Sequence, residues 1–350
     1  MLGPFPYALV FVPVALALGG LAWGGPWTWA TVAFVFGVVP LLDLVLGRNE
    51  ANPAPDAPPS RLTYWGFRLV TWAVVPALVG LTLAAAFVIT TRPFAPWELA
   101  GLVVSVGVAS GGLGITVAHE LIHKTGRFER TLGDALLLNA CYMHFAIEHV
   151  IGHHGRVATP EDPASARLGE SFYAFWPRTV VGSFKSAWGI EVARLARAGQ
   201  GVWTPRNRML WYVALPLALA ATLGALWGPL AAAFYLAQGV VAFSLLEVVN
   251  YLEYYGLERE PLPNGRYARV ADHHSWSCAN RFTNWFLFQL QRHADHHVHA
   301  MRRYEDLRHV EGSPELPTGY AGMIWLALVP PLWRRVMDPR VAAVRAGAQS

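Results

Sequence analysis

Six apolar runs, each about long enough to cross a bilayer, constrain this chain more than any other feature. A membrane helix needs roughly 20 predominantly apolar residues. Of the 350 residues, 54% are hydrophobic and only 14% are charged, which is unusual for a soluble globular protein. The sequence therefore predicts an all-α integral membrane protein with six transmembrane helices. The runs are Phe5–Trp23, Trp27–Leu46, Trp65–Thr90, Trp97–Val117, Met209–Trp227 and Leu230–Val249.

The distribution of positive charge predicts the orientation of these helices. The short connections "GGP", "TRPFAP" and "GP", after the first, third and fifth runs, contain Arg92 as their single basic residue out of 27 Lys and Arg. Because cytoplasmic loops are enriched in Lys and Arg, we expect both termini and the polar regions to be cytoplasmic, in an inner (cytoplasmic) membrane. The first run lacks a basic leader, so we expect a retained anchor and not a signal peptide.

This topology divides the chain into four consecutive parts of one integrated domain. Residues 1–118 would form the first four transmembrane helices, and 209–252 the last two. Residues 119–208 and 253–350 would form a cytoplasmic, histidine-rich helical region. The apolar stretch 319–337 is interrupted by Pro330 and Pro331, and we expect it to lie at the interface or to dock on the protein.

Eight of the 13 histidines fall into three clusters, "HELIHK", "EHVIGHHG" and "LQRHADHHVH". The topology brings all three to one membrane face, and spacings of three and four residues place imidazoles on one side of a helix. Imidazole suits iron, zinc and copper. Eight imidazoles exceed what one ion needs, so we predict two metal ions. The histidines are His119, His123, His149, His153, His154, His293, His296 and His297.

Five carboxylates inside or beside the clusters could orient imidazole N–H groups. His144, His299 and His309 are interpreted as ordinary polar residues. The two cysteines are too few for an appended four-cysteine metal module within this chain. The five carboxylates are Glu120, Glu148, Asp162, Glu253 and Asp295.

Several functions are compatible with this pattern. "HELIH" matches H-E-x-x-H, the zinc metalloprotease signature, in which Glu120 would be the general base. That reading leaves two histidine clusters unexplained. Paired iron can activate O2, so an oxidase fits the number of imidazoles better. A non-catalytic transporter or metal sensor is a further alternative.

At the level of motifs the chain resembles the membrane di-iron alkane 1-monooxygenases (alkane omega-hydroxylases), within the fatty-acid desaturase-like superfamily. The resemblance covers nearly the whole chain, and "VATPEDPASAR" separates it from ordinary fatty-acid desaturases. It rests on "HELIHK", "EHVIGHHGRVATPEDPASARLGESFY", "NYLEYYGL", "DHHSW" and "LQRHADHHVHAMRRYEDLR".

The resemblance implies hydroxylation of a terminal methyl group with O2 at a cytoplasmic di-iron site whose ligands are the eight histidines. Electrons would come from NADH through a rubredoxin reductase and a rubredoxin, and an alkane would enter from the bilayer. A fatty-acyl desaturase or hydroxylase of the same superfamily is the alternative. Arg302, Arg303 and Arg308 would suit an acidic electron donor.

One position departs from the family pattern N-Y-x-E-H-Y-G, whose histidine is a ninth iron ligand. This chain has Tyr254 there, between the matching Glu253 and Tyr255. Tyr254 could ligate through its phenolate or leave a coordination position open. Alternatively, His273 or His274 could substitute, although both stand in the family's own "HHSW" context.

A substrate tunnel should run through the membrane helices to the metal site. Candidate lining residues are Val35, Phe36, Gly37 and Trp72. Small and aromatic residues there could equally serve helix packing. Val35 occupies a position that is bulky in some relatives, and a smaller side chain should deepen the tunnel and admit longer chains.

Overall fold

The computed structural model describes residues 3–53 and 60–347. Within these residues the regular structure is helical, and β pairing is limited to three isolated bridges. Six helical segments are long and apolar enough to cross a membrane. The predicted all-α fold with six membrane helices is confirmed.

Among the described residues, the first span coincides with its predicted run and the other five extend slightly beyond theirs. The first four are η1 (Phe5–Val10) with α1 (Phe11–Trp23); η2 (Gly25–Trp29), α2 (Ala30–Ala33), η3 (Phe34–Val38) and α3 (Val39–Leu46); α4 (Arg61–Thr91); and α5 (Pro96–Val108), η4 (Ala109–Ile115) and α6 (Thr116–Ile122). The last two are α11 (Arg208–Trp227) and α12 (Pro229–Tyr254). The expected domain boundaries at 118/119 and 252/253 thus fall inside α6 and α12, so two membrane helices continue into the histidine-rich region.

The remaining helices connect and cover these spans, and most of them are short. They are α7 (Arg127–Asn139), α8 (Phe145–Ile147), η5 (Glu148–His153), α9 (His154–Arg156), α10 (Phe172–Arg197), η6 (Asp272–His274), α13 (Arg281–Phe286), α14 (His293–Val298), η7 (Tyr304–Asp306), α15 (Tyr320–Ala327) and α16 (Pro330–Gly347).

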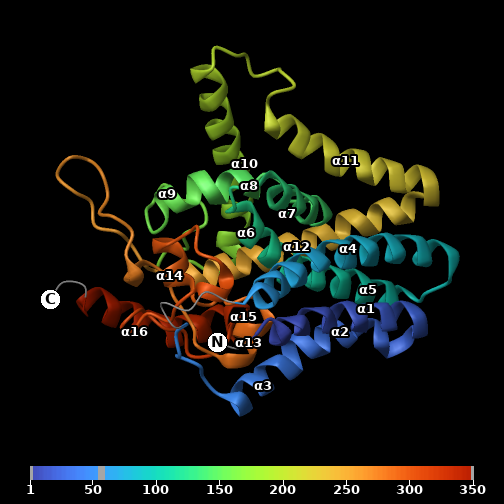
Figure 1. Ribbon diagram of the computed structural model, residues 1–350, viewed down its shortest axis with the longest axis horizontal. Helices are drawn as coiled ribbons and strands as arrows, with labels where there is room; N and C mark the ends of the chain where they lie inside the picture. The colour runs from blue at the N-terminus through green and yellow to red at the C-terminus, as the bar shows by residue number, and fades with distance from the viewer. Residues whose placement is uncertain (1–2, 54–59, 348–350) are drawn as a thin grey trace.

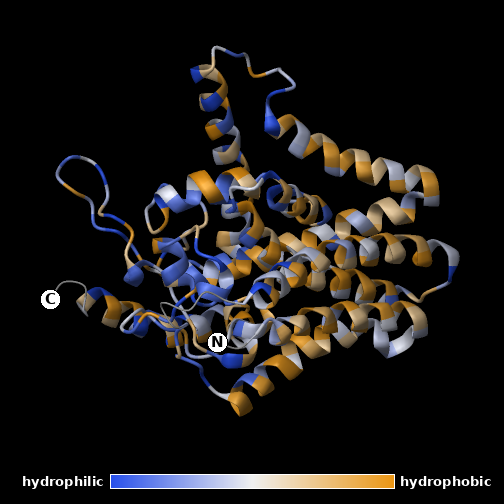
Figure 2. Cartoon of the chain, in the orientation of Figure 1, coloured by the Kyte–Doolittle hydropathy of each residue, from blue (hydrophilic) through white to orange (hydrophobic). Residues whose placement is uncertain are grey.

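The molecule has two dissimilar ends (Figure 1). The short connections that follow α1, α4 and α11 lie together at one end, and α9, α14 and α16 lie toward the other. Hydrophobic residues follow the long helices, whereas hydrophilic residues gather around α14 and the neighbouring loops (Figure 2). The histidine-bearing elements therefore sit in the polar half of the molecule.

Close packing of the fourth span against α12 depends on glycine. A Cβ at Gly111 would overlap the backbone carbonyl of Ala242, and a Cβ at Gly107 would lie 2.8 Å from the carbonyl oxygen of Gln238. Small residues let membrane helices approach closely. These two glycines therefore let α5 and η4 pack closely against α12.

The C-terminal apolar segment folds into α15 and α16 and docks on the end of α12. The Trp333 ring contacts Tyr251 and Tyr255, with centroids 4.9 and 5.2 Å apart. The Tyr255 hydroxyl donates to Asp338 Oδ1 at 2.7 Å. These contacts fix the last turn of α12, which carries Tyr254.

Candidate metal centre

Five imidazoles form a first donor set. One ring nitrogen from each lies within 4.8 Å of the corresponding nitrogen of every other member. His154 Nε2 is 3.1 Å from His149 Nε2 and 3.2 Å from His296 Nε2. The set joins α6, the η5–α9 segment and α14. Its members are His119, His123, His149, His154 and His296.

A π-helical turn brings His149 and His154 together. In η5 the backbone follows the i→i+5 pattern, so residues five apart are aligned, whereas an α-helix aligns residues three and four apart. Such turns are frequent at functional sites. The turn leaves His153 pointing toward a second group of residues.

That second donor set surrounds the hydroxyl of Tyr254. His153 Nε2 lies 2.9 Å and His297 Nε2 2.7 Å from the hydroxyl oxygen, and His293 Nε2 is also in contact with it. His293 Nε2 and His297 Nε2 are 3.0 Å apart. The second donor set therefore comprises His153, Tyr254, His293 and His297.

The expectation that histidines spaced three and four residues apart lie on one side of a helix holds for α14, but its three histidines do not all belong to one donor set. His293 and His297, four residues apart, serve the second set, while His296 serves the first. Residues four apart differ by only about 40° around an α-helix, but His296 and His297 differ by about 100°. One short helix can thus supply both sets.

The two donor sets are adjacent. The rings of His154 and His297 stack with centroids 4.5 Å apart, and those of His149 and His153 with centroids 5.2 Å apart. His119 and His293 are 6.4 Å apart. This arrangement suits two neighbouring cations better than one.

Burial favours the neutral form of an imidazole, which is the form that binds metals. Burial, and then the neighbouring imidazoles, hold the pKa values of His123, His149 and His296 well below the usual range, and lower that of His154 to about 2. The buried Nε2 atoms of His119 and His123 have no hydrogen-bond partner among the described residues. Because buried polar atoms are normally bonded, the first donor set fits a metal ion.

Two of the five candidate carboxylates contact proposed ligands. Asp162 Oδ2 lies 2.9 Å from His153 Nδ1 and accepts from the Ser165 hydroxyl at 2.7 Å. Burial alone would raise the pKa of Asp162, but His153 and Ser165 hold it below its usual value. Glu253 Oε2 lies 3.2 Å from His293 Nε2, and its Oε1 accepts from Tyr320 at 2.7 Å.

The other three carboxylates brace neighbouring segments. Glu120 is ion-paired with Lys124 at 2.8 Å, and Glu148 with Arg156 at 2.9 Å. Asp295 binds Arg302 and accepts from the backbone N–H of Arg308 at 2.9 Å. Among the described residues, none of these bonds reaches an imidazole of either donor set.

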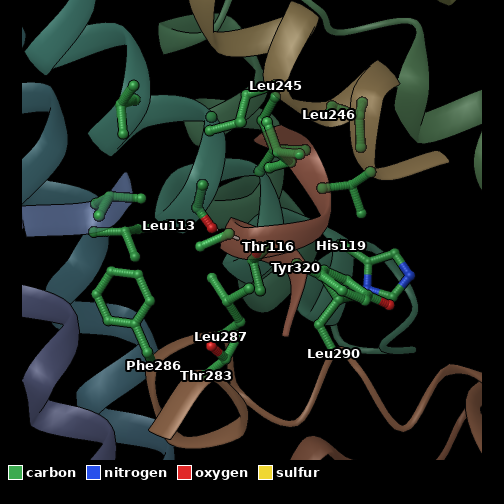
Figure 3. A pocket seen from close by; sticks show the side chains of 18 of the residues that line it. Leu113, Thr116, His119, Leu245, Leu246, Thr283, Phe286, Leu287, Leu290 and Tyr320 are labelled. Atoms are coloured by element: carbon green, nitrogen blue, oxygen red, sulfur yellow. Dashed lines mark hydrogen bonds between the residues drawn. The ribbon is translucent and has the colours of Figure 1, made fainter. Parts of the chain in front are cut away.

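An apolar cavity leads through the membrane helices to both donor sets (Figure 3). Val35 and Phe36 are among the residues that line it. Leu113, Leu245, Leu246, Phe286, Leu287 and Leu290 line its length, and Thr116, Thr283 and Tyr320 add hydroxyl groups. At its inner end it reaches His119 and His149 of the first set and His293 of the second.

Comparison with known proteins identifies the family. The fatty acid desaturase family model matches residues 95–327, two thirds of the chain. Alkane 1-monooxygenase 2 of Pseudomonas aeruginosa is 45% identical over 92% of this chain and 86% of its own. Alkane 1-monooxygenase 1 of the same organism is 46% identical over 92% of this chain and 85% of its own. Alkane 1-monooxygenase 2 of Alcanivorax borkumensis is 41% identical over 92% of this chain and 84% of its own. The chain belongs to the alkane 1-monooxygenase family.

In a member of this family, His273 or His274 could replace the ninth histidine ligand only if it lay beside a donor set. Both lie in η6, where their rings contact each other and His274 Nδ1 accepts from the backbone N–H of Ala271 at 2.9 Å. Among the described residues, no hydrogen bond or ring contact joins them to a donor set. The oxygen of Tyr254 occupies the place between the imidazoles.

The lining of the apolar cavity shows which of the four tunnel candidates of this alkane 1-monooxygenase family member face it. Val35 and Phe36 line the cavity, whereas Trp72 packs against Trp65 and Phe128, with centroids 6.0 and 5.0 Å apart. Gly37 is not among the residues that line the cavity. The sequence interpretation missed Tyr320, which reaches both the cavity and Glu253. Its motif "LPTGYAG" resembles the family, but a single tyrosine carries no metal-ligand spacing that could have revealed it.

Proposed function

We propose that this chain is a membrane monooxygenase that hydroxylates the terminal methyl group of n-alkanes, or of similar alkyl chains, to 1-alkanols. The overall reaction is R–CH3 + O2 + 2 electrons + 2 H+ → R–CH2OH + H2O. The observation that carries this proposal is the apolar cavity that ends on imidazoles of both donor sets. A cavity with apolar walls recognises an alkyl chain by burial alone.

The cofactor we propose is a pair of non-haem iron ions. The residues that would hold it are His119, His123, His149, His154 and His296 on one side and His153, His293 and His297, with Tyr254, on the other. Bound iron supplies the activation of O2 that the reaction requires. The converging imidazoles of the two donor sets and their burial support this assignment.

The protein itself positions the substrate and excludes water from it. We propose that a linear substrate enters the cavity end first, so that its terminal carbon comes closest to His119 and His293, which line it. Positioning of this kind lowers the barrier without direct chemical participation. Asp162, through His153, and Glu253, beside His293, hold imidazoles of the second set in place.

Each turnover requires two electrons from a partner. We propose a rubredoxin, reduced by an NADH-dependent rubredoxin reductase, that docks on the cytoplasmic face of an inner membrane protein. The positive charge around the site supports an acidic donor. Part of that charge is internally paired, since Arg303 binds Glu129 at 3.0 Å and Arg302 binds Asp295.

Product analysis tests the proposed reaction. Membranes containing the full chain are supplied with rubredoxin, reductase, NADH and 18O2, and then with octane, hexadecane or a fatty acid. We expect 1-octanol or 1-hexadecanol carrying one 18O atom, dependent on rubredoxin. A cis-alkene without alcohol would instead identify a desaturase. Peptide cleavage with one zinc per chain would identify a metalloprotease.

A further inference from the structure

The second donor set has a chemistry of its own because an oxygen lies at its centre. The Tyr254 side chain is completely buried, and its hydroxyl contacts the Nε2 atoms of three histidines. In the first donor set all members are imidazoles. Any cation held by the second set would therefore meet an oxygen donor as well as nitrogens.

The position of the Tyr254 hydroxyl is tightly determined by its surroundings. Val157 and Ala158 pack against the Tyr254 side chain on one side. The next residue, Tyr255, is anchored by Asp338 and Trp333. Because the last turn of α12 is held from both directions, the hydroxyl is directed at the imidazoles and not away from them.

Hydrogen bonding alone gives a poor account of this cluster. The Asp162 carboxylate accepts a hydrogen bond from His153 Nδ1. The proton of the His153 ring is therefore on Nδ1, and Nε2 carries a free lone pair. The hydroxyl has one proton to share among three nitrogens, two of which lie only 3.0 Å from each other, and Glu253 Oε2 adds a further oxygen 3.2 Å from His293 Nε2. Converging lone pairs from one oxygen and several nitrogens are the usual arrangement around a cation.

We infer that Tyr254 is itself a metal ligand, whose phenolate oxygen completes a three-imidazole, one-phenolate set with His153, His293 and His297. This inference rests on the proposed two-iron function. When the metal binds, the O–H bond of Tyr254 breaks, the oxygen–metal bond forms, and the proton is released to solvent. The phenolate contributes a negative charge that none of the five imidazoles of the first set supplies.

An anionic, hard oxygen donor favours the ferric state over the ferrous state. The two irons are thus unequal: the iron beside Tyr254 is harder to reduce than the iron held by five imidazoles. A phenolate bound to ferric iron also gives a ligand-to-metal charge-transfer absorption in the visible region. Imidazole ligands give no such band, so the colour of the oxidised protein reports on the ligand.

The test uses the full chain, purified in detergent, loaded with iron and oxidised with ferricyanide. Absorption and resonance Raman spectra are recorded for the wild type, Tyr254→Phe and Tyr254→His, with iron counted in each. We expect a visible band with tyrosinate ring vibrations in the wild type and its loss in both variants. Tyr254→His restores an imidazole donor, so it should retain both irons while losing the band.

Tyr251→Phe is the matched control. Tyr251 lies one turn earlier in α12, is equally buried, and donates its hydroxyl proton to the carbonyl of Glu170 at 2.7 Å. This variant should keep the band. A wild type with two irons and no tyrosinate band, or a band unchanged in Tyr254→Phe, overturns the inference and leaves the proposed function standing. A wild type that binds no iron overturns both.

Discussion

Single contacts to the imidazoles decide how well each one is oriented. Asp162 holds Nδ1 of His153, so that Nε2 of the same ring faces the second donor set. A carboxylate in this position fixes the tautomer and raises the basicity of the ligand.

Replacing Asp162 with Asn should lower the metal affinity of the second donor set by about 10–100-fold. The backbone should still fold, because Ser165 and the surrounding turn remain. Iron retained per chain after dialysis against a graded series of chelator concentrations measures the effect. Glu161→Gln, at the exposed neighbouring position, is the control and should behave as the wild type. Equal retention in Asp162→Asn and the wild type would remove Asp162 from the site.

Val35 offers a second test at the scale of one side chain. It lines the apolar cavity from η3, so Val35→Trp should shorten the space available to the substrate. Turnover of hexadecane should fall by about tenfold or more relative to octane. Val38→Trp is the matched control, since Val38 lies in the same turn but is 42% exposed. An unchanged hexadecane-to-octane ratio in Val35→Trp would contradict the assignment of the cavity to the substrate.

The sequence indicated which residues could bind metal but not which carboxylates touch them. Glu120, Glu148 and Asp295 each stand next to a histidine in the sequence. The two acids that contact a proposed ligand are instead Asp162 and Glu253. Glu120 forms an ion pair with Lys124, and Glu148 forms one with Arg156. Such choices depend on how separate elements meet, which sequence proximity does not encode.

Among the elements, the π-helical turns were the least predictable feature. The apolar run Trp97–Val117 predicted one membrane helix through 109–115 and gave no sign of the wider turn η4, and no sequence pattern indicated η5. Both lie at the site: η5 separates His153 from its neighbours, and η4 lines the cavity. The helices themselves were predictable because their length and hydropathy suffice.

The contact between η4 and α12 should be sensitive to one added methyl group. Gly111→Ala places a Cβ against the backbone carbonyl of Ala242, which has no flexible side chain to yield. We expect destabilisation of roughly 1–3 kcal/mol, as for other overpacked sites. Thermal unfolding in detergent measures it. At Gly112 an added Cβ would meet only Leu245 Cδ2 at 3.4 Å, so Gly112→Ala is the control and should unfold near the wild-type temperature. Equal unfolding temperatures for the two variants would contradict the packing argument.

The junction of α10 and α11 should be sensitive to acid. Glu191 binds Arg194 and Arg208, each at 2.7 Å, and accepts from the backbone N–H of Arg208 at 2.9 Å. Burial alone would raise the pKa of Glu191, but these hydrogen bonds lower it to about 2. Since the folded-state pKa is depressed, the stabilisation is present above the unfolded-state pKa near 4.3 and is lost as the pH falls toward 2.

The unfolding temperatures of the wild type and Glu191→Gln, followed from pH 7 to pH 3, check this assignment. The wild type should be the more stable at pH 7, and the difference should shrink below about pH 4. A difference that does not depend on pH would show that the charge of Glu191 contributes nothing.

At the scale of the whole molecule, six membrane helices bring three distant stretches of sequence to one site. The topology expected from hydropathy accounts for their meeting, and the number of histidines indicated two ions. The division of the histidines into a set of five and a set of three with Tyr254 became visible only in three dimensions. The docking of α16 beside Tyr254 likewise required the folded chain.

The central claim is that these two donor sets hold a pair of irons. Metal analysis of the purified full-length chain, by mass spectrometry against protein concentration, tests it most directly. The account predicts about two irons per chain in the wild type and a clear loss in His296→Ala, with insertion into the membrane unchanged. One zinc per chain, or the same iron content in His296→Ala as in the wild type, would contradict it.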